Sequence, residues 1–189
     1  MRNESQIKKE LVSDKHEKYP IRFVTFKKVN NYDNSEYLKL KELILKIHEV
    51  NPNDKILVLG RTNNVINKCF NEVDLKDDIG SKIEFVGYED IFIDGMTMHK
   101  SKGLTYDQVI VIGLNKNFPS SGYSVFWLES LFKNEMIDEG IPFAEERRLF
   151  YVALTRTKNK VFLLVNEDMN DRSIFLNEIY QIIKENTIS

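Results

Sequence analysis

Lysines and a glycine gather in the stretch TMHKSKGL (residues 97–104), which lies between two apolar segments. Lys100 and Lys102 supply positive charge for phosphate oxygens, Ser101 supplies a hydroxyl, and Gly103 allows a ligand to approach the backbone closely. These residues could grip an anion or a nucleic-acid backbone. Alternatively, the lysines are solvated and Gly103 only permits the turn, which from this stretch alone is the more frequent case.

Three arginines belong to a second stretch, AEERRLFYVALTR (residues 144–156). Its apolar residues recur at helical spacing, so it is predicted to be a mostly buried helix. Arg147 and Arg148 are expected to pair with the glutamates just before them. Arg156 follows the helix end, where a guanidinium could reach a phosphate across a cleft. It could equally be a favourable charge at a helix C-terminus, and the residues alone leave these two interpretations even.

A third polar group, Arg61, Thr62 and Asn63, comes directly after the apolar run KILVLG. These side chains could contact a nucleic-acid backbone and base edges. Thr62 or Asn63 could instead cap the helix that follows, which is the more frequent role of such residues.

Several catalytic patterns are missing from the sequence. It has no G-x-x-x-x-G-K-[ST] phosphate loop, and no predicted strand ends in an acidic pair for magnesium, so the chain alone is predicted not to hydrolyse ATP. Ser101, His99 and His48 have no acid placed with them to form a nucleophilic site. The single cysteine, Cys69, cannot form an internal disulfide, and no Cys/His spacing suggests a metal site.

The bulk composition fits one globular domain. The chain has 189 residues, 42% hydrophobic and 30% charged, with a formal net charge of −2, so any nucleic-acid contact must come from a local patch. No apolar run is long enough for a membrane span, and no signal peptide begins the chain. A cytoplasmic protein is expected, with a polar arm at residues 1–19 and one domain at residues 20–189.

Apolar runs that alternate with helical patterns predict a three-layer α/β domain with a mainly parallel sheet and helices on both faces. In such sheets, ligands bind at the carboxyl ends of strands. Residues 71–94 show turn chemistry followed by one or two short strands. The predicted strands are 21–26, 55–60, 92–97, 108–114 and 160–165, and the predicted helices are 35–50 with Ser35 as N-cap, one beginning after Gly60, 125–132, 143–155 and 173–185.

Two stretches carry a resemblance to a known family. TMHKSKGLTYDQVIVIG resembles motif V, and AEERRLFYVALTRTKNKVFLL resembles motif VI, of the second RecA-like domain (2A) of UvrD/Rep-type superfamily 1 DNA helicases. GRTNN is similar to a shorter arginine motif between motifs IV and V. The likeness extends over roughly residues 21–179, with the motifs in 95–165. It implies a P-loop-NTPase-type fold and a 3′ to 5′ translocase on single-stranded DNA, whose two RecA-like domains close on ATP and Mg²⁺.

The resemblance also implies roles for particular residues. Arg156 would be the motif VI arginine finger that reaches the γ-phosphate of ATP held mainly by an N-terminal RecA-like domain. Gly103 and Thr105 would lie on the nucleotide side of motif V. The nucleic-acid contacts would be Arg61, Thr62, Asn63, Thr97, His99 and Lys102.

The sequence departs from the family pattern in three places. Thr105 stands where many members have a glutamate that hydrogen-bonds the ribose. The stretch before motif V is too short for the helical 2B domain that the best-known members insert, and motif IV is not visible. The leading hypothesis is the C-terminal motor domain of a helicase, with an isolated chain that is inactive. The alternative is a non-catalytic helicase-like module that serves a protein or nucleic-acid partner.

Overall fold

The computed structural model describes residues 20–28, 34–72, 75–78, 82–85, 90–119 and 143–187, with side chains described outside 70–89 and 181–187. The predicted arm at residues 1–19 and the predicted helix at residues 125–132 lie outside these ranges. Within them, no helix is both long and apolar enough to cross a bilayer.

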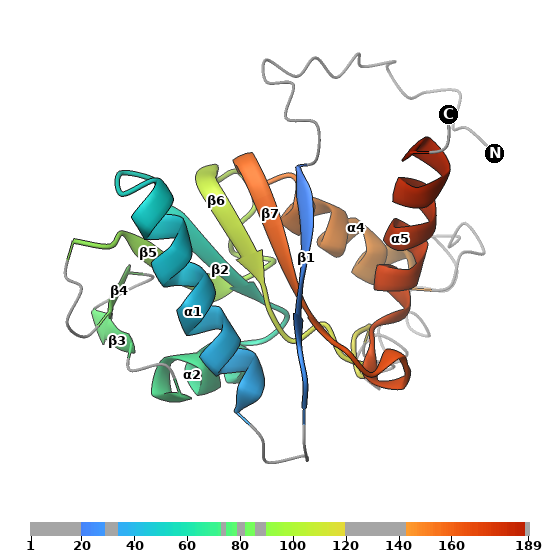
Figure 1. The fold of residues 1–189 in the computed structure, drawn as a ribbon, viewed down its shortest axis with the longest axis horizontal. Helices are drawn as coiled ribbons and strands as arrows, with labels where there is room; N and C mark the ends of the chain where they lie inside the picture. The colour runs from blue at the N-terminus through green and yellow to red at the C-terminus, as the bar shows by residue number, and fades with distance from the viewer. Residues whose placement is uncertain are drawn as a thin grey trace, which may run out of the picture.

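The centre of the molecule is one seven-stranded sheet (Figure 1). Its strands, in the spatial order β1-β7-β6-β2-β5-β4-β3, are β1 (Ile21–Phe26), β7 (Thr157–Asn166), β6 (Tyr106–Val111), β2 (Ile56–Gly60), β5 (Ile93–Thr97), β4 (Lys82–Phe85) and β3 (Leu75–Asp78). The pairs from β1 to β5 are all parallel, and β4 and β3 add an antiparallel hairpin at one edge. The mainly parallel sheet is therefore confirmed, but residues 75–78 and 82–85 form strands where the sequence predicted turns.

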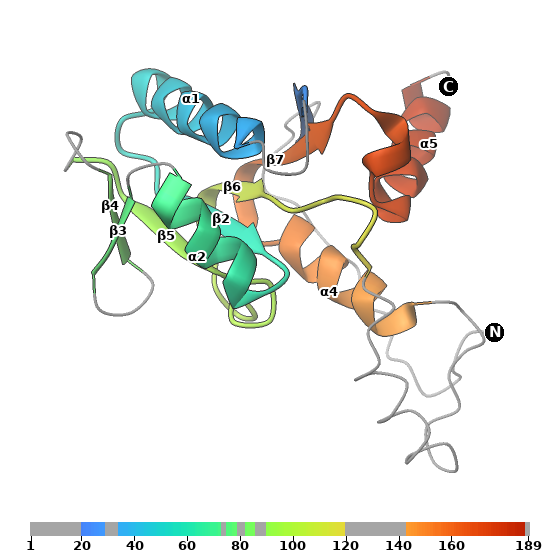
Figure 2. The ribbon, with the colours of Figure 1, turned by 90° about the horizontal axis from the view of Figure 1, so that it is seen from below.

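Helices cover both faces of this sheet (Figure 2). The helices are α1 (Ser35–Val50), α2 (Asn63–Glu72), α4 (Ala144–Leu154) and α5 (Ile174–Thr187), with a short 3₁₀ turn, η1 (Met169–Asp171). Side chains of α1 and α2 share one core cluster, and side chains of α4 and α5 share the other. The three-layer α/β architecture is confirmed.

Strand β2 shows why the sequence folds into layers. Its residues are all buried, and successive side chains of a strand point to opposite faces. Ile56 and Val58 join the cluster under α1 and α2, whereas Leu57 and Leu59 join the cluster under α4 and α5. A strand covered on both faces has to be apolar throughout, which is the pattern that predicted it.

The start of α1 differs from the prediction by one residue. The carbonyl oxygen of Asn34 accepts hydrogen bonds from the backbone nitrogens of Tyr37 (2.9 Å) and Leu38 (3.0 Å), so Asn34 is the N-cap. Ser35 is the first residue inside the helix, and its predicted role as N-cap is wrong. The side chain of Asn34 makes no capping hydrogen bond.

Candidate functional site

The predicted nucleic-acid residues come from two neighbouring strands. Strands β2 and β5 are paired in parallel with Gly60 opposite Thr97, and the backbone nitrogen of Met98 donates to the carbonyl oxygen of Gly60 at 3.0 Å. The chain after β2 and the chain after β5 therefore leave the carboxyl edge of the sheet side by side. This register brings residues 61–63 next to residues 97–99.

The side chains at this edge differ in exposure. Thr62, Asn63 and His99 are exposed, whereas Thr97 is buried and its hydroxyl accepts a hydrogen bond from the backbone nitrogen of Lys100 at 3.4 Å. The hydroxyl of Thr62 accepts from the backbone nitrogen of Val65 at 3.4 Å, so this residue caps α2, as the alternative interpretation held. The exposed side chains are accessible to a ligand, whereas Thr97 holds the turn.

Arg61 and Glu146 form a bidentate ion pair at the same edge. The Nε of Arg61 donates to Oε2 of Glu146 at 2.7 Å and to Oε1 at 3.0 Å, and Nη2 also donates to Oε1. Glu146 is only 4% exposed. These hydrogen bonds raise the pKa of Arg61 further above its usual value, so its guanidinium stays protonated. The guanidinium of Arg61 is thus paired with a carboxylate of helix α4 (Ala144–Leu154).

The segment 98–105 links the two edges of the sheet without a helix. Strands β5 and β6 flank β2 and run parallel to it, so the chain between them must return from the carboxyl edge to the amino edge. The hydroxyl of Ser101, fully buried, donates to the carbonyl of Met98 at 2.7 Å, so it is not presented to a ligand. Gly103 has a φ of +86°, which only glycine adopts readily. Lys102 and Thr105 are exposed.

Arg156 lies at the amino edge, where α4 turns into β7. Its Nε donates to the carbonyl of Val152 at 3.0 Å, and its Nη1 donates to the carbonyl of Leu104 at 3.2 Å. Its Nη2 donates to the hydroxyl of Thr155 at 3.1 Å, and its own carbonyl accepts from the nitrogen of Tyr106 at 2.9 Å. Among the described residues, the guanidinium contacts no carboxylate. Segment 98–105 thus ends against Arg156.

The sequence predicted that the arginines of helix α4 pair with the glutamates just before them, and the structure agrees with this in part. Glu145 pairs with Arg148 at 3.4 Å, as expected, but Glu146 pairs with the distant Arg61 instead of a neighbouring arginine. Glu146 faces the end of β2 and is buried, whereas Glu145 points to solvent. Arg147 pairs with Glu178 of α5 at 2.7 Å.

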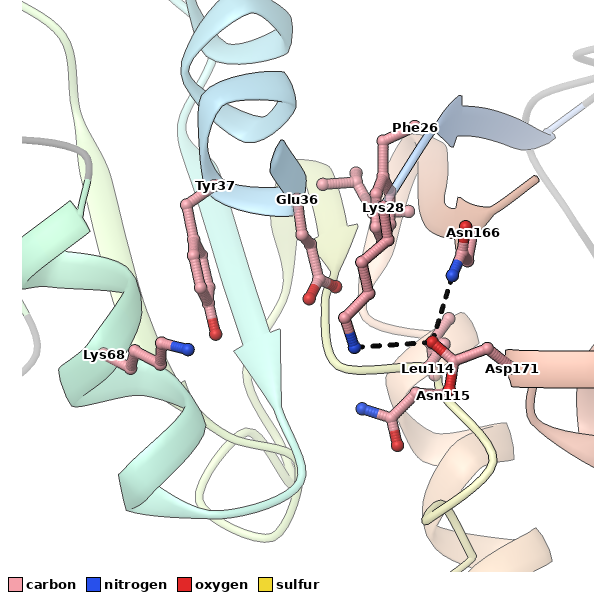
Figure 3. Close-up of a pocket in the computed structure, with 10 residues that line it drawn as sticks. Phe26, Lys28, Glu36, Tyr37, Lys68, Leu114, Asn115, Asn166 and Asp171 are labelled. Atoms are coloured by element: carbon pink, nitrogen blue, oxygen red, sulfur yellow. Dashed lines mark hydrogen bonds and ion pairs between the residues drawn. The ribbon is translucent and has the colours of Figure 1, made fainter. Parts of the chain in front are cut away.

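A cavity at the carboxyl ends of β1, β6 and β7 was not foreseen from the sequence (Figure 3). It has about 560 Å³ of empty space, open in part to solvent, and charged groups line it. Lys28 pairs with Asp171 at 3.5 Å, and Glu36 accepts from the nitrogen of Gly113 at 2.7 Å. Burial raises the pKa of Glu36, although the Gly113 hydrogen bond and the lysines oppose this. These groups come from separate elements, so no local pattern signals them.

No metal centre is evident in the described part of the chain, where no three His, Cys, Asp or Glu side chains are grouped to hold an ion. The chemistry of the site therefore rests on arginines, hydroxyls and backbone groups.

The sheet with five parallel strands and helices on both faces is the architecture of a RecA-like domain. The chain belongs to the family of UvrD-like helicase C-terminal domains, whose family model matches residues 1–168. The resemblance inferred from motifs V and VI is confirmed.

Individual relatives agree with the family. The chain is 44% identical over 78 residues to DNA helicase IV of Escherichia coli, a match that covers 40% of this chain and 11% of the relative. It is 34% identical over 124 residues to a probable DNA helicase II homolog of Mycoplasma pneumoniae, covering 65% of this chain and 15% of the relative. The chain thus spans a small part of these relatives.

A solved structure shares the fold. The C-terminal domain of a possible DNA helicase from Lactobacillus plantarum superposes with a TM-score of 0.53 at 13% identity. The match covers 84% of this chain and 79% of that chain. At this level of identity, the likeness concerns the fold alone.

Proposed function

We propose that the chain is the C-terminal motor domain of an ATP-dependent DNA helicase that works in the cytoplasm. In this proposal an N-terminal RecA-like domain holds ATP and Mg²⁺, and Arg156 reaches the γ-phosphate as an arginine finger. Gly103 and Thr105 lie on the same side as the nucleotide. The helicase moves 3′ to 5′ along single-stranded DNA, which passes the carboxyl edge at Arg61, Thr62, Asn63, Thr97, His99 and Lys102.

The observation that carries the proposal is the environment of Arg156. Its three hydrogen-bond acceptors in the described part of the chain are two carbonyl oxygens and a hydroxyl, all electrically neutral. They fix the direction of the guanidinium without cancelling its charge. A guanidinium that is oriented and not neutralised is suited to bind a phosphate that carries developing negative charge in the transition state. The group is partly exposed, so such a phosphate can reach it.

The strand-binding side is supported by exposure and by register. Asn63 and His99 are exposed on adjacent chain segments at the carboxyl edge. An amide can hydrogen-bond the backbone or base edges, and an imidazole ring can stack on an unpaired base. Thr97 would act on the strand through the turn that its hydroxyl holds.

The test compares this chain alone with the chain joined to an N-terminal ATP-binding motor domain. The joined protein should hydrolyse ATP, and single-stranded DNA should stimulate the rate. The chain alone should show no hydrolysis, because it has no phosphate loop. A joined protein that binds single-stranded DNA but never hydrolyses ATP would favour a non-catalytic binding module, and robust hydrolysis by the purified chain alone would reveal a nucleotide site of its own.

A further inference from the structure

The ion pair between Arg61 and Glu146 joins elements from the two faces of the sheet. Arg61 lies two residues before α2, whose buried side chains belong to one core cluster, and Glu146 lies in the first turn of α4, whose side chains belong to the other. The partners are 85 residues apart in the chain. The pair therefore connects the loop that carries Thr62 and Asn63 to the helix that ends at Arg156.

In the described part of the chain, two ion pairs hold the start of α4 to other elements: Arg61 with Glu146, and Arg147 with Glu178 of α5. Phe143, its N-cap, has a φ of 59° and provides no side-chain capping hydrogen bond. The carboxylate of Glu146 interacts favourably with the helix N-terminus. It also accepts the bidentate hydrogen bonds of the Arg61 guanidinium. The two parallel hydrogen bonds of such a fork fix an orientation, which a single contact would not do.

A pair of this kind contributes little net stability. Removing two charges from water costs about as much as their attraction returns, so buried ion pairs are better at defining one geometry than at stabilising a fold. The exposed pair of Glu145 with Arg148 on the same helix has neither burial nor a distant partner, and the pair of Arg147 with Glu178 has a distant partner but no burial. The difference indicates that the geometry of α4 is what Arg61 and Glu146 define.

We propose that Arg61 and Glu146 are positioning residues that couple strand binding to the arginine finger. Helix α4 links the ion pair to the arginine finger, because Arg156 follows Glu146 by ten residues, roughly 15 Å along a helix. A strand that contacts Thr62 and Asn63 shifts the loop, the ion pair carries that shift to the start of α4, and the helix moves Arg156. This inference rests on the proposed function and adds how DNA regulates it.

The experiment uses Glu146→Gln, which keeps the size of the side chain and removes its charge, and Arg61→Lys, which keeps the charge and loses the fork. Glu145→Gln, an exposed neighbour on the same helix, is the matched control. In the joined protein, the ratio of DNA-stimulated to unstimulated ATP turnover should fall at least about tenfold in both test variants. The KM for ATP and the Kd for an oligothymidylate in Glu146→Gln should stay within about threefold of wild type, and Glu145→Gln should keep the wild-type ratio.

Two results would overturn the inference. One is a stimulation ratio in Glu146→Gln within about twofold of wild type in a folded protein, as checked by circular dichroism and thermal unfolding. The other is a Kd for oligothymidylate in Glu146→Gln that rises in proportion to the loss of stimulation, because Glu146 would then be part of the strand-binding surface. If Glu146→Gln does not fold, Arg61→Lys decides by the same ratio.

A second measurement separates this inference from the proposed function. If the wild-type joined protein shows no DNA-stimulated hydrolysis, the proposed function fails. Hydrogen exchange of the 189-residue chain then tests the coupling by itself. Oligothymidylate should change amide exchange at residues 152–157 in the wild-type chain and not in Glu146→Gln. An equal change in both chains, or no change in the wild-type chain, overturns the coupling.

Discussion

The two edges of the sheet each hold an arginine that follows a buried element, and the two differ in their partners. At the carboxyl edge, Arg61 is bound by the carboxylate of Glu146, which is 4% exposed. At the amino edge, Arg156 is bound by the carbonyls of Val152 and Leu104 and by the hydroxyl of Thr155. The charge of Arg61 is thus compensated by a carboxylate, whereas Arg156 is oriented by neutral acceptors that leave its charge uncompensated.

This difference shows how one residue type can serve two purposes. A carboxylate partner satisfies both the hydrogen bonds and the charge of a guanidinium, so the group becomes a fixed connection between elements. Neutral acceptors satisfy only the hydrogen bonds, so the group still attracts an anion. The role of each arginine is therefore set by its acceptors, and the first three of the following predictions separate the two edges.

The largest effect is expected from Arg156→Ala. In the joined protein, ATP turnover should fall by about 10³-fold or more, because an arginine finger stabilises charge that develops on the transferred phosphoryl group. Binding of single-stranded DNA should stay near wild type, since Arg156 lies at the opposite edge from Asn63 and His99. Steady-state kinetics with a titration of fluorescent oligothymidylate measures both quantities. A turnover close to wild type would remove Arg156 from the nucleotide site.

The next effect concerns stability and compares the two arginines directly. Arg61→Met should lower the free energy of unfolding by about 3 kcal/mol, because it leaves the buried carboxylate of Glu146 without its partner. Arg156→Met should cost less than about 1 kcal/mol, since the carbonyls it leaves at the partly exposed amino edge can be hydrated. Urea unfolding of the 189-residue chain measures both values. Equal losses of unfolding free energy in the two variants would contradict the distinction between an arginine paired with a carboxylate and an arginine bound only by neutral acceptors.

A smaller effect is expected from His99→Ala. In the proposed function the exposed imidazole stacks on a base, and loss of one stacking contact costs about 1 kcal/mol, or about fivefold in Kd. Binding of oligothymidylate should weaken by this factor, while the KM for ATP in the joined protein stays unchanged. The exposed Lys116, beyond the end of β6, provides a control variant, Lys116→Ala. Equal losses of DNA and ATP binding would place His99 elsewhere.

The smallest effect is a pH dependence at the carboxyl-edge cavity. Burial raises the pKa of Glu36 above its ordinary value of 4.5, so the folded chain holds more protons than the unfolded chain just above that pH. The free energy of unfolding should therefore fall as the pH rises through the window above 4.5. Glu36→Gln cannot titrate and still offers Gly113 an acceptor, so the variant should be more stable than wild type at pH 7.

Thermal unfolding between pH 4 and pH 7 checks this sign. The advantage of Glu36→Gln should shrink toward pH 4, where the wild-type carboxyl is protonated in both states. Glu49→Gln, an exposed position on the same helix, should show no such trend. A stability difference that does not change with pH would mean that titration of Glu36 is not its cause.

Much of the fold could be predicted because its signals are local. The apolar run of β2 and the helical spacing of α1 depend on neighbouring residues, and both elements were placed within a residue of their observed bounds. The hairpin of β3 and β4 was missed because its strands are short and contain turn-forming and charged residues. Such strands are stabilised by pairing, β4 with β5 and β3 with β4, rather than by their own pattern.

In the candidate site, too, the features with a local sequence signal could be predicted and those that depend on distant residues could not. The motifs around Gly103 and Arg156 could be found in the sequence because each is a compact run, and family membership agrees with them. The partner of Glu146 could not be found, since the local rule assigns a glutamate in a helix to a neighbouring arginine. The cavity around Glu36 also draws its residues from several elements.

The sequence by itself determined the alternation of strands and helices, the two motif runs and the absence of a phosphate loop, because each of these is a property of consecutive residues. Only the tertiary structure decided which arginine is neutralised and which keeps its charge. That outcome depends on which acceptor lies within about 3 Å of each guanidinium. Val152 and Thr155 are neighbours of Arg156 in the chain, whereas Glu146 and Leu104 are brought to their arginines only by the tertiary packing of the sheet and its helices.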